Sequence, residues 1–309
     1  MKRLVLLFAA LALSASAETQ PAPSGKIAPG IESVIVTAPN LRDEKVLDNF
    51  ILGHTVRSSY LGKVGRWKAG ICPVTIGLPG KFDTFITQRI IKVAMMAGAP
   101  LEKREPCRPN LIVLATDQAQ PLMDMIRVKH SSILGYHYRS QAEKLATMRL
   151  PVQAWYSTVT EDWLGEIKSD TEGLNINSAM SGVAALPYLT GALHASGMRT
   201  YDGLKTEFGV VLVVIDTEKI AGLEIGALAD YVAMLGLSQG RNDSYDTCAE
   251  VPTITNLMAP GCSDAMKPVG LTDIDLTYLR GLYRMNAGMQ YNGEVGSIAF
   301  EMKRELGGY

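Results

Sequence analysis

Several stretches of the chain are rich in β-branched and other apolar residues and end in turn-forming residues. Such stretches are typical of strands, because branched side chains pack well on a pleated surface. The most hydrophobic of them, FGVVLVVIDTEKI, covers residues 208–220. Strands are predicted at residues 32–39, 72–80, 109–117, 151–162 and 208–220.

Other segments repeat their apolar residues every three or four positions, which predicts helices with one buried face. These helices are expected at residues 41–54, 82–99, 118–129, 222–237 and 271–283. Thr272 is a good N-cap for the last of them, and Asp273 and Asp275 fall in its first turn, where the helix dipole favours acidic groups.

The order of these elements predicts how part of the sheet is built. Strand 72–80, helix 82–99 and strand 109–117 follow one another, which favours two parallel strands joined by a right-handed crossover. The segments at 165–182 and 241–264 are polar or irregular and predict loops. The chain shows no internal repeat, so we expect a single α+β domain at residues 32–309, with an α/β-like mixed sheet and helices.

The N-terminus has the pattern of an export signal. Lys2 and Arg3 precede an apolar stretch, and small residues at Ala15 and Ala17 predict cleavage before Glu18. Residues 1–17 are therefore interpreted as a signal peptide and 18–31 as a disordered leader. The alternative is an uncleaved anchor, although the apolar stretch is short for a bilayer. The expected location is the periplasm or the exterior, without stable membrane insertion after cleavage.

Export changes the interpretation of the four cysteines. An even number in an oxidising compartment favours disulfides, and the pairs Cys72–Cys107 and Cys248–Cys262 each close a modest loop. Cys72 and Cys107 also precede two strands predicted to be parallel, which would bring them close together. Four free, buried thiols are the alternative.

Composition and motifs exclude several functions. The chain has 309 residues and a formal net charge of −1, without a long basic run, so nucleic acid is not an expected partner. Nucleotide-binding glycine motifs and the G-x-S-x-G turn of serine hydrolases are absent, and no cofactor is predicted. The four histidines lack metal-ligand spacing, which favours surface or structural roles: they are His54, His130, His137 and His194.

The spacing of residues 208–283 resembles the catalytic half of metzincin zinc proteases of the matrixin type, with H-E-x-x-H-x-x-G-x-x-H, a methionine turn and a closing helix. The chain is also similar to uncharacterised exported proteobacterial proteins with an L-A-D-Y segment. In the stretch LADYVAMLGLSQ, the three histidine positions hold Ala229, Ala233 and Gln239, while Asp230 replaces the glutamate, Gly236 keeps the glycine and Thr255 stands at the methionine of the turn.

The resemblance implies a metzincin-like scaffold that has lost its metal. Alanine offers no lone pair to zinc, so no metal and no metalloprotease activity are predicted. The small side chains at 229, 233 and 236 either pack against another segment or line a groove. A non-catalytic protein that binds a peptide or an envelope protein is expected. The alternative is a hydrolase with an unrecognised, non-zinc site, for which nearby acidic residues are candidates: Asp230, Asp243, Asp246 and Glu250.

Overall fold

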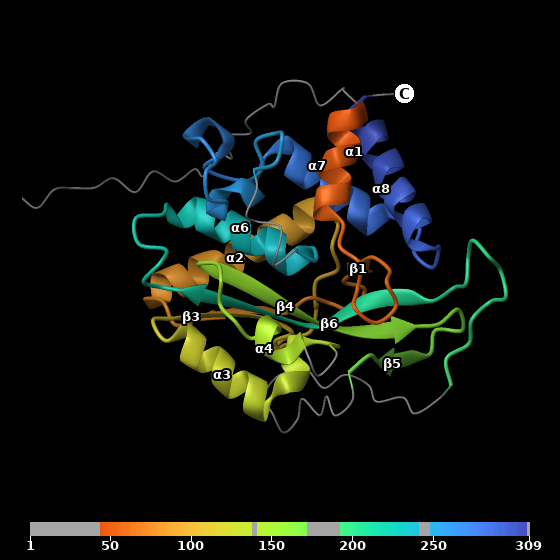
Figure 1. The fold of residues 1–309 in the computed structure, drawn as a ribbon, viewed down its shortest axis with the longest axis horizontal. Helices are drawn as coiled ribbons and strands as arrows, with labels where there is room; N and C mark the ends of the chain where they lie inside the picture. Colours follow the sequence, from red (N-terminus) through yellow and green to blue (C-terminus); the bar gives the residue numbers. More distant parts are fainter. Residues whose placement is uncertain (1–43, 138–140, 172–191, 241–247, 308–309) are drawn as a thin grey trace, which may run out of the picture. The chain divides into compact units, whose positions relative to one another are not determined.

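The structure of the protein is a computed structural model, and it describes residues 44–137, 141–171, 192–240 and 248–307 (Figure 1). The predicted signal peptide at 1–17, the leader at 18–31 and the strand at 32–39 lie outside the described residues.

A mixed sheet forms the centre of the described part. Its strands run in the order β2-β3-β6-β4-β5, and β1 pairs with the beginning of β6. β1, β2, β3 and β6 are parallel where they pair, whereas β4 is antiparallel to both β6 and β5. The strands are β1 (Gly65–Arg66), β2 (Pro73–Ile76), β3 (Leu111–Thr116), β4 (Val152–Glu161), β5 (Ile167–Ser169) and β6 (Lys205–Asp216).

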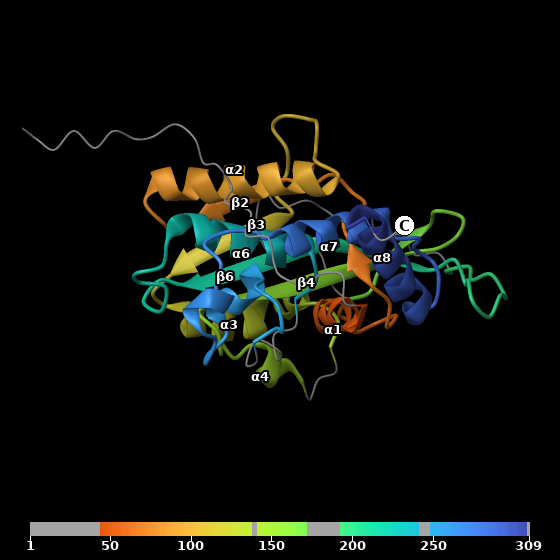
Figure 2. The same cartoon turned by 90° about the horizontal axis from the view of Figure 1, so that it is seen from above.

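Helices cover both faces of this sheet. α2 and α6 lie on one face and α3 on the other, while α1, α7 and α8 gather toward one end (Figures 1 and 2). The helices are α1 (Glu44–His54), α2 (Gly80–Ala97), α3 (Ala119–Lys129), α4 (Ala142–Leu145), α6 (Ile225–Leu237), α7 (Asp273–Arg284) and α8 (Tyr291–Glu305), with 3-10 turns η1 (Ser131–Leu134), η3 (Ile254–Met258) and η4 (Asp264–Met266).

The hydrophobic core is divided in two by the sheet. On β6, Val211 and Val213 belong to the cluster under α2 and α6, whereas Leu212 and Val214 belong to the cluster under α3. Successive side chains of a strand point to opposite faces, so a strand that feeds both clusters must be apolar at nearly every position. This explains why β6 was the most hydrophobic predicted strand.

The mixed α+β class and the predicted crossover are confirmed. β2 and β3 pair in parallel with α2 between them, and α2 is followed by Gly98, whose positive φ of 76° suits the residue after a helix. Thr272 caps α7 through a capping box with Asp275. The structure also contains both predicted disulfides, with Cα–Cα distances of 6.1 Å for Cys72–Cys107 and 5.5 Å for Cys248–Cys262.

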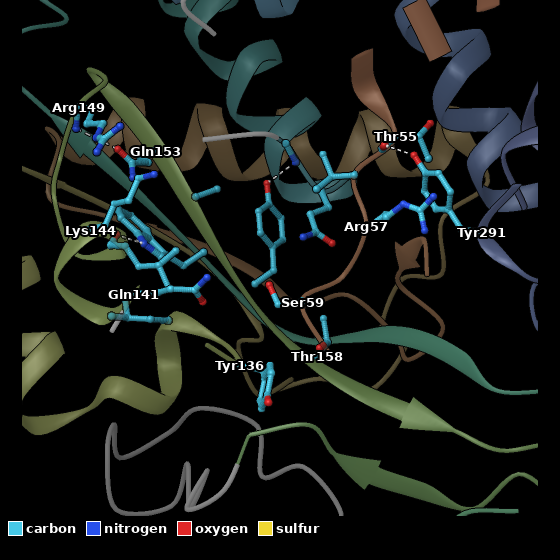
Figure 3. Close-up of a pocket in the computed structure, with 18 of the residues that line it drawn as sticks. Thr55, Arg57, Ser59, Tyr136, Gln141, Lys144, Arg149, Gln153, Thr158 and Tyr291 are labelled. Carbon is cyan, nitrogen blue, oxygen red and sulfur yellow. Dashed lines mark hydrogen bonds between the residues drawn. The ribbon is translucent and has the colours of Figure 1, made fainter. Parts of the chain in front are cut away.

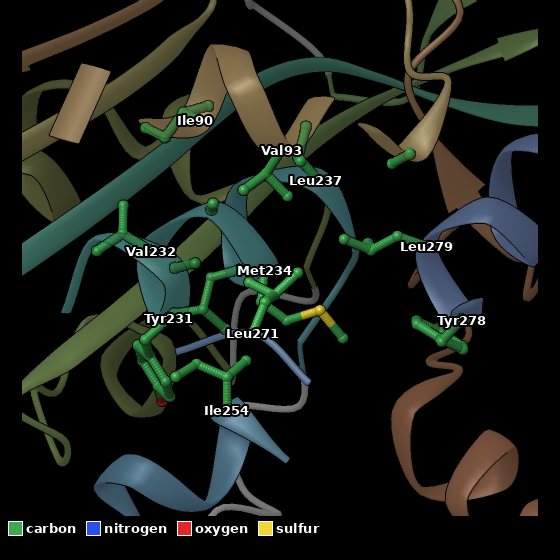
Figure 4. Packing of buried hydrophobic residues seen from close by; sticks show 14 of the residues in the cluster. Ile90, Val93, Tyr231, Val232, Met234, Leu237, Ile254, Leu271, Tyr278 and Leu279 are labelled. Carbon is green, nitrogen blue, oxygen red and sulfur yellow. The ribbon is translucent and has the colours of Figure 1, made fainter. Parts of the chain in front are cut away.

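Other elements differ from the prediction. β5 lies within the segment predicted as the loop 165–182, and neither β1 nor α8 was predicted. α6 begins at Ile225 instead of residue 222 and is buried around its whole circumference from Ala227 to Leu237. α2, the loop before α7, η3 and α7 all supply side chains to its surroundings, as Figure 4 shows. A helix surrounded in this way needs no polar face.

Candidate functional site

The small residues of α6 lie in the core. Ala229 and Ala233 have no exposed surface, and a Cβ on Gly236 would come within 2.8 Å of a Leu111 methyl group on β3. The predicted degenerate cleft is therefore absent from this helix in the described part of the chain. Small side chains at these positions let α6 pack closely against its neighbours, which was the packed alternative.

Asp230 is a structural residue and not a base facing a cleft. Its carboxylate accepts hydrogen bonds from Nε and Nη2 of Arg89 on α2, and from the backbone N–H of Leu271 at 2.9 Å. The hydrogen bonds to Asp230 raise the pKa of Arg89 above its ordinary value. Because both side chains are buried, this pair joins α2, α6 and the loop before α7.

Thr255 belongs to a second buried network. Its hydroxyl is 2.9 Å from Nε2 of His54 and 3.2 Å from the hydroxyl of Thr253, which in turn donates to Asp275. Burial lowers the pKa of His54 and raises that of Asp275. The network fastens α1 and η3 to α7, which agrees with the structural role predicted for His54.

The acidic residues proposed for a hydrolase near α6 do not meet among the described residues. Asp230 forms an ion pair with Arg89, and the exposed Glu250 accepts a hydrogen bond from Asn49. Asp243 and Asp246 lie outside the described residues. Within the described ranges, no group of three or more His, Cys, Asp or Glu side chains is placed to hold a metal ion.

A cavity of about 580 Å³ lies beside β4 (Figure 3). We call it the β4 pocket. Its lining comes from the end of α1 and the loop after it, from residues within 134–136, 141–149 and 153–158, from the residues after α6 and from the first residue of α8. Of the six predicted cleft residues, only Gln239 is in its wall: the lining consists of Leu52, Thr55, Val56, Arg57, Ser59, Leu134, Tyr136, Gln141, Lys144, Leu145, Arg149, Gln153, Ala154, Trp155, Tyr156, Thr158, Gln239, Gly240 and Tyr291.

Hydrogen bonds hold the walls of the β4 pocket in place. The Tyr156 hydroxyl donates to the carbonyl of Leu235 and accepts from the N–H of Gly240, which fixes the end of α6 above β4. The Trp155 indole donates to the Leu145 carbonyl at 2.8 Å and thereby holds α4 against the sheet. A pocket with a fixed wall loses little entropy when a ligand binds.

The side chain of Gln239 differs from those of Tyr156 and Trp155 in its hydrogen bonding. Its side-chain oxygen is buried without a hydrogen-bond partner, close to Gly65 of β1. A buried acceptor without a donor destabilises the folded protein, and such groups are rare in native structures. Because this oxygen is buried beside Gly65, which does not line the pocket, it is not open to a ligand in the β4 pocket.

The pocket carries positive charge. Arg57, Lys144 and Arg149 line it, all three are exposed, and no carboxylate occurs in the described lining. The Arg57 guanidinium lies over the ring of Tyr291, 3.7 Å from its centroid, and the Tyr291 hydroxyl donates to the carbonyl of Thr55. This cation–π contact orients Arg57 without neutralising it.

The outer edge of β4 is partly occupied. The Thr158 carbonyl accepts a hydrogen bond from the N–H of Asp170. Gly135 lies so close that a Cβ there would be 2.1 Å from the Tyr156 carbonyl oxygen. Side chains in the pocket are therefore better placed to hold a ligand than a continuous row of backbone groups on this strand.

A second cavity, of about 560 Å³, lies at the other end of β4 and β6. Glu207, Lys68 and Lys205 line it, and Glu161 accepts hydrogen bonds from both lysines. Burial, together with the neighbouring Glu161, raises the pKa of Glu207 to about 8. Although burial alone would raise the pKa of Glu161, hydrogen bonds from Glu207, Lys68 and Lys205 lower it to about 2. Near neutral pH the pair therefore contains one carboxylate and one carboxylic acid.

No helix in the described ranges is long and apolar enough to cross a membrane. No protein-family profile matches the chain, and neither the curated proteins nor the solved structures yield a match.

Proposed function

We propose that this protein is an exported, non-catalytic binding protein, and that a peptide or a segment of an envelope protein occupies the β4 pocket. The observation that carries the proposal is the contrast within the pocket. Its walls are fixed by Tyr156 and Trp155, whereas the side chains of Arg57, Lys144 and Arg149 offer positive charges with no carboxylate partner among the described residues. A preformed cavity with a few unsatisfied polar groups is typical of a binding site.

Export is supported by the two disulfides, which fit an oxidising compartment such as the periplasm or the exterior. A metzincin-like scaffold also remains a proposal. It is supported by the succession of β6, α6, the turn around Thr255 and α7, with the antiparallel β4 beside β6. The burial of Ala229 and Ala233 counts against a cleft retained at the protease position, so the proposed binding site lies elsewhere.

The proposal is tested by selecting binders from a displayed library of random heptapeptides and measuring their affinity by fluorescence anisotropy. Ser59→Trp is the informative variant, because Ser59 is exposed on the pocket wall and a bulky ring there would fill the cavity. The matched control is Val128→Trp on α3, since Val128 is 71% exposed and outside the pocket.

We expect the selected peptides to bind the wild type and the Val128→Trp variant equally, and to lose about tenfold or more in affinity for Ser59→Trp. If no peptide is selected, or if Ser59→Trp binds all selected peptides as well as the wild type does, the proposed function is wrong.

A second candidate, a hydrolase with a non-zinc site, is favoured by Glu161 and Glu207 alone. One carboxylate and one carboxylic acid beside a cavity are the pair that general acid–base catalysis uses. The two lysines that bind Glu161 argue for an ion-pair network instead. Turnover of chromogenic esters, phosphates and glycosides that disappears in both Glu161→Gln and Glu207→Gln, but not in Ser59→Trp, would establish the hydrolase. Absence of turnover in the wild type would exclude it for these substrates.

A further inference from the structure

We infer that the ligand of the β4 pocket is an acidic peptide whose carboxylates contact the cations of its two walls. The inference rests on the proposed function, because it names the chemical class of the ligand for that same site. Two features of the lining support it: the charges on the two walls and the apolar part of the cavity.

The positive charges come from separate parts of the chain and lie on two sides of the pocket. Arg57 lies with Tyr291 on one wall, and Lys144 and Arg149 lie on the other, as Figure 3 shows. Neither wall supplies a carboxylate from the described residues, and none of the three cations forms an ion pair there. Cations left without counter-charges around a cavity attract an anionic ligand.

An aromatic contact orients the cation on one wall. Arg57 is stacked on Tyr291, whose hydroxyl donates to the Thr55 carbonyl at 2.8 Å. On the opposite wall, the Gln153 side chain accepts a hydrogen bond from the backbone N–H of Arg149 at 3.1 Å, which fixes the chain there and not the guanidinium. Because the cations lie on opposite walls, a ligand that contacts both walls must be elongated, with negative groups near both of its ends.

The apolar part of the pocket favours a peptide over a simple anion. The wall contains the apolar side chains of Leu52, Leu134 and Leu145 beside its cations. A phosphate or sulfate ion offers no apolar surface to these side chains. A peptide supplies carboxylates and apolar side chains together, so it matches both features.

The experiment uses three fluorescein-labelled heptapeptides of one apolar background, with glutamate, glutamine or lysine at the second and sixth positions. Anisotropy titrations with the full mature protein are run at about 50 and about 300 mM salt, because screening weakens contacts between exposed charges. Unlabelled heparin and polyphosphate are added as competitors, to separate an acidic peptide from other polyanions.

The informative variant combines Arg57→Gln, Lys144→Gln and Arg149→Gln, which removes three positive charges from the pocket. Its matched control combines Lys92→Gln, Lys103→Gln and Lys129→Gln. These three lysines are also exposed, form no ion pair among the described residues and lie outside the pocket. Both variants change the net charge equally, so any difference between them reports the location of the charge.

We expect the glutamate peptide to bind about tenfold or more tightly than the glutamine peptide, and the lysine peptide to bind least. The pocket variant should lose this preference, while the control variant changes affinity less than about twofold. Equal binding of the glutamate and glutamine peptides, or equal loss in the two triple variants, overturns the inference. Stronger binding of heparin or polyphosphate through the same three cations also overturns it.

Failure of this inference is distinguishable from failure of the proposed function. If Ser59→Trp abolishes binding of the library peptides but the charge-removing triple variant does not weaken it, the pocket binds peptides and the acidic ligand is refuted. If Ser59→Trp does not weaken peptide binding, both the proposed function and the acidic ligand are refuted.

Discussion

Positively charged side chains have different surroundings in the core and in the β4 pocket. In the core between α2 and α6, Arg89 meets Asp230 in a buried pair that accepts a further hydrogen bond from Leu271. In the β4 pocket, Arg57, Lys144 and Arg149 surround a cavity with no carboxylate in its described lining. The first set is neutralised within the protein, whereas the second set has no carboxylate partner among the described residues.

The comparison shows that similarity to a protease motif does not identify the candidate binding site. Asp230 stands where a zinc protease has its catalytic glutamate, yet its partners are internal and its role is to hold helices together. The pocket residues carry no recognisable motif, yet Arg57, Lys144 and Arg149 form no ion pair among the described residues. A buried polar group with all its partners is typical of structure, and an unsatisfied group beside a cavity is typical of binding.

The largest effect is expected from breaking the core pair. Asp230→Ala leaves Arg89 buried without its counter-charge, and we expect the free energy of unfolding to fall by about 3–5 kcal/mol in urea titrations. The double variant Arg89→Met with Asp230→Leu should recover most of that loss, because it removes both charges and fills similar space. An Asp230→Ala protein of wild-type stability would mean that Asp230 is not a structural residue.

The second largest effect is expected from a glycine substitution in the core, compared with the same substitution at a helix position with open space. Gly236→Ala places a methyl group against Leu111, and we expect it to destabilise the protein by about 1–3 kcal/mol. Gly296→Ala on α8 is the matched control, since no atom lies within 4 Å of its added Cβ. Because alanine favours helix more than glycine does, this control should be neutral or stabilising by up to about 1 kcal/mol. Equal shifts in melting temperature in the two variants would show that Gly236 is not closely packed against β3.

A smaller effect concerns the second cavity and depends on pH. The pKa of Glu207 is about 8 in the folded protein, above its ordinary value of 4.5, so the folded state binds more protons between these values. The stability that this group contributes is fully present below about pH 4.5 and is lost as the pH rises through 8.

We therefore expect Glu207→Gln to be more stable relative to the wild type at pH 9 than at pH 5, by an amount on the order of 1 kcal/mol, because Lys68 and Lys205 compensate part of the second charge. Chemical denaturation at the two pH values measures this difference. The opposite sign, or no difference, would contradict the raised pKa of Glu207.

The smallest effect tests how Arg57 is oriented. Tyr291→Leu removes the ring beneath the guanidinium and should weaken binding of the acidic heptapeptide about two- to fivefold. Tyr291→Phe keeps the ring and should retain most of the affinity, although it loses the hydrogen bond to Thr55. If the leucine and phenylalanine variants bind equally, the cation–π contact does not orient Arg57 for the ligand.

Much of the fold could be predicted from local patterns. The strand at β6, the crossover through α2 and the cap at Thr272 each depend on residues close together in the sequence. β1 and β5 are too short for a periodic pattern to identify them. The apolar residues of α8 do have helical spacing, at Val295, Ile298, Ala299 and Met302, so local sequence carries a signal for this helix.

The candidate site was less predictable, because it depends on contacts between distant segments. Arg89 and Asp230 are 141 positions apart, and no local pattern pairs them. The resemblance to zinc proteases predicted a cleft at α6. Of the six residues predicted for that cleft, only Gln239, just beyond the end of the helix, lines the β4 pocket. Arg57 and Lys144 are ordinary surface residues in the sequence, and only folding brings them to opposite walls of one cavity.

Hydrogen exchange with and without the acidic heptapeptide tests the central claim most directly, because it locates the binding site without a substitution. The peptide is predicted to slow amide exchange in residues 55–59 and 144–158, and this protection should be absent in Ser59→Trp. Unchanged exchange in both segments at saturating peptide, or protection confined to residues 205–207 and 284–287 around the second cavity, would contradict the assignment of the β4 pocket as the functional site.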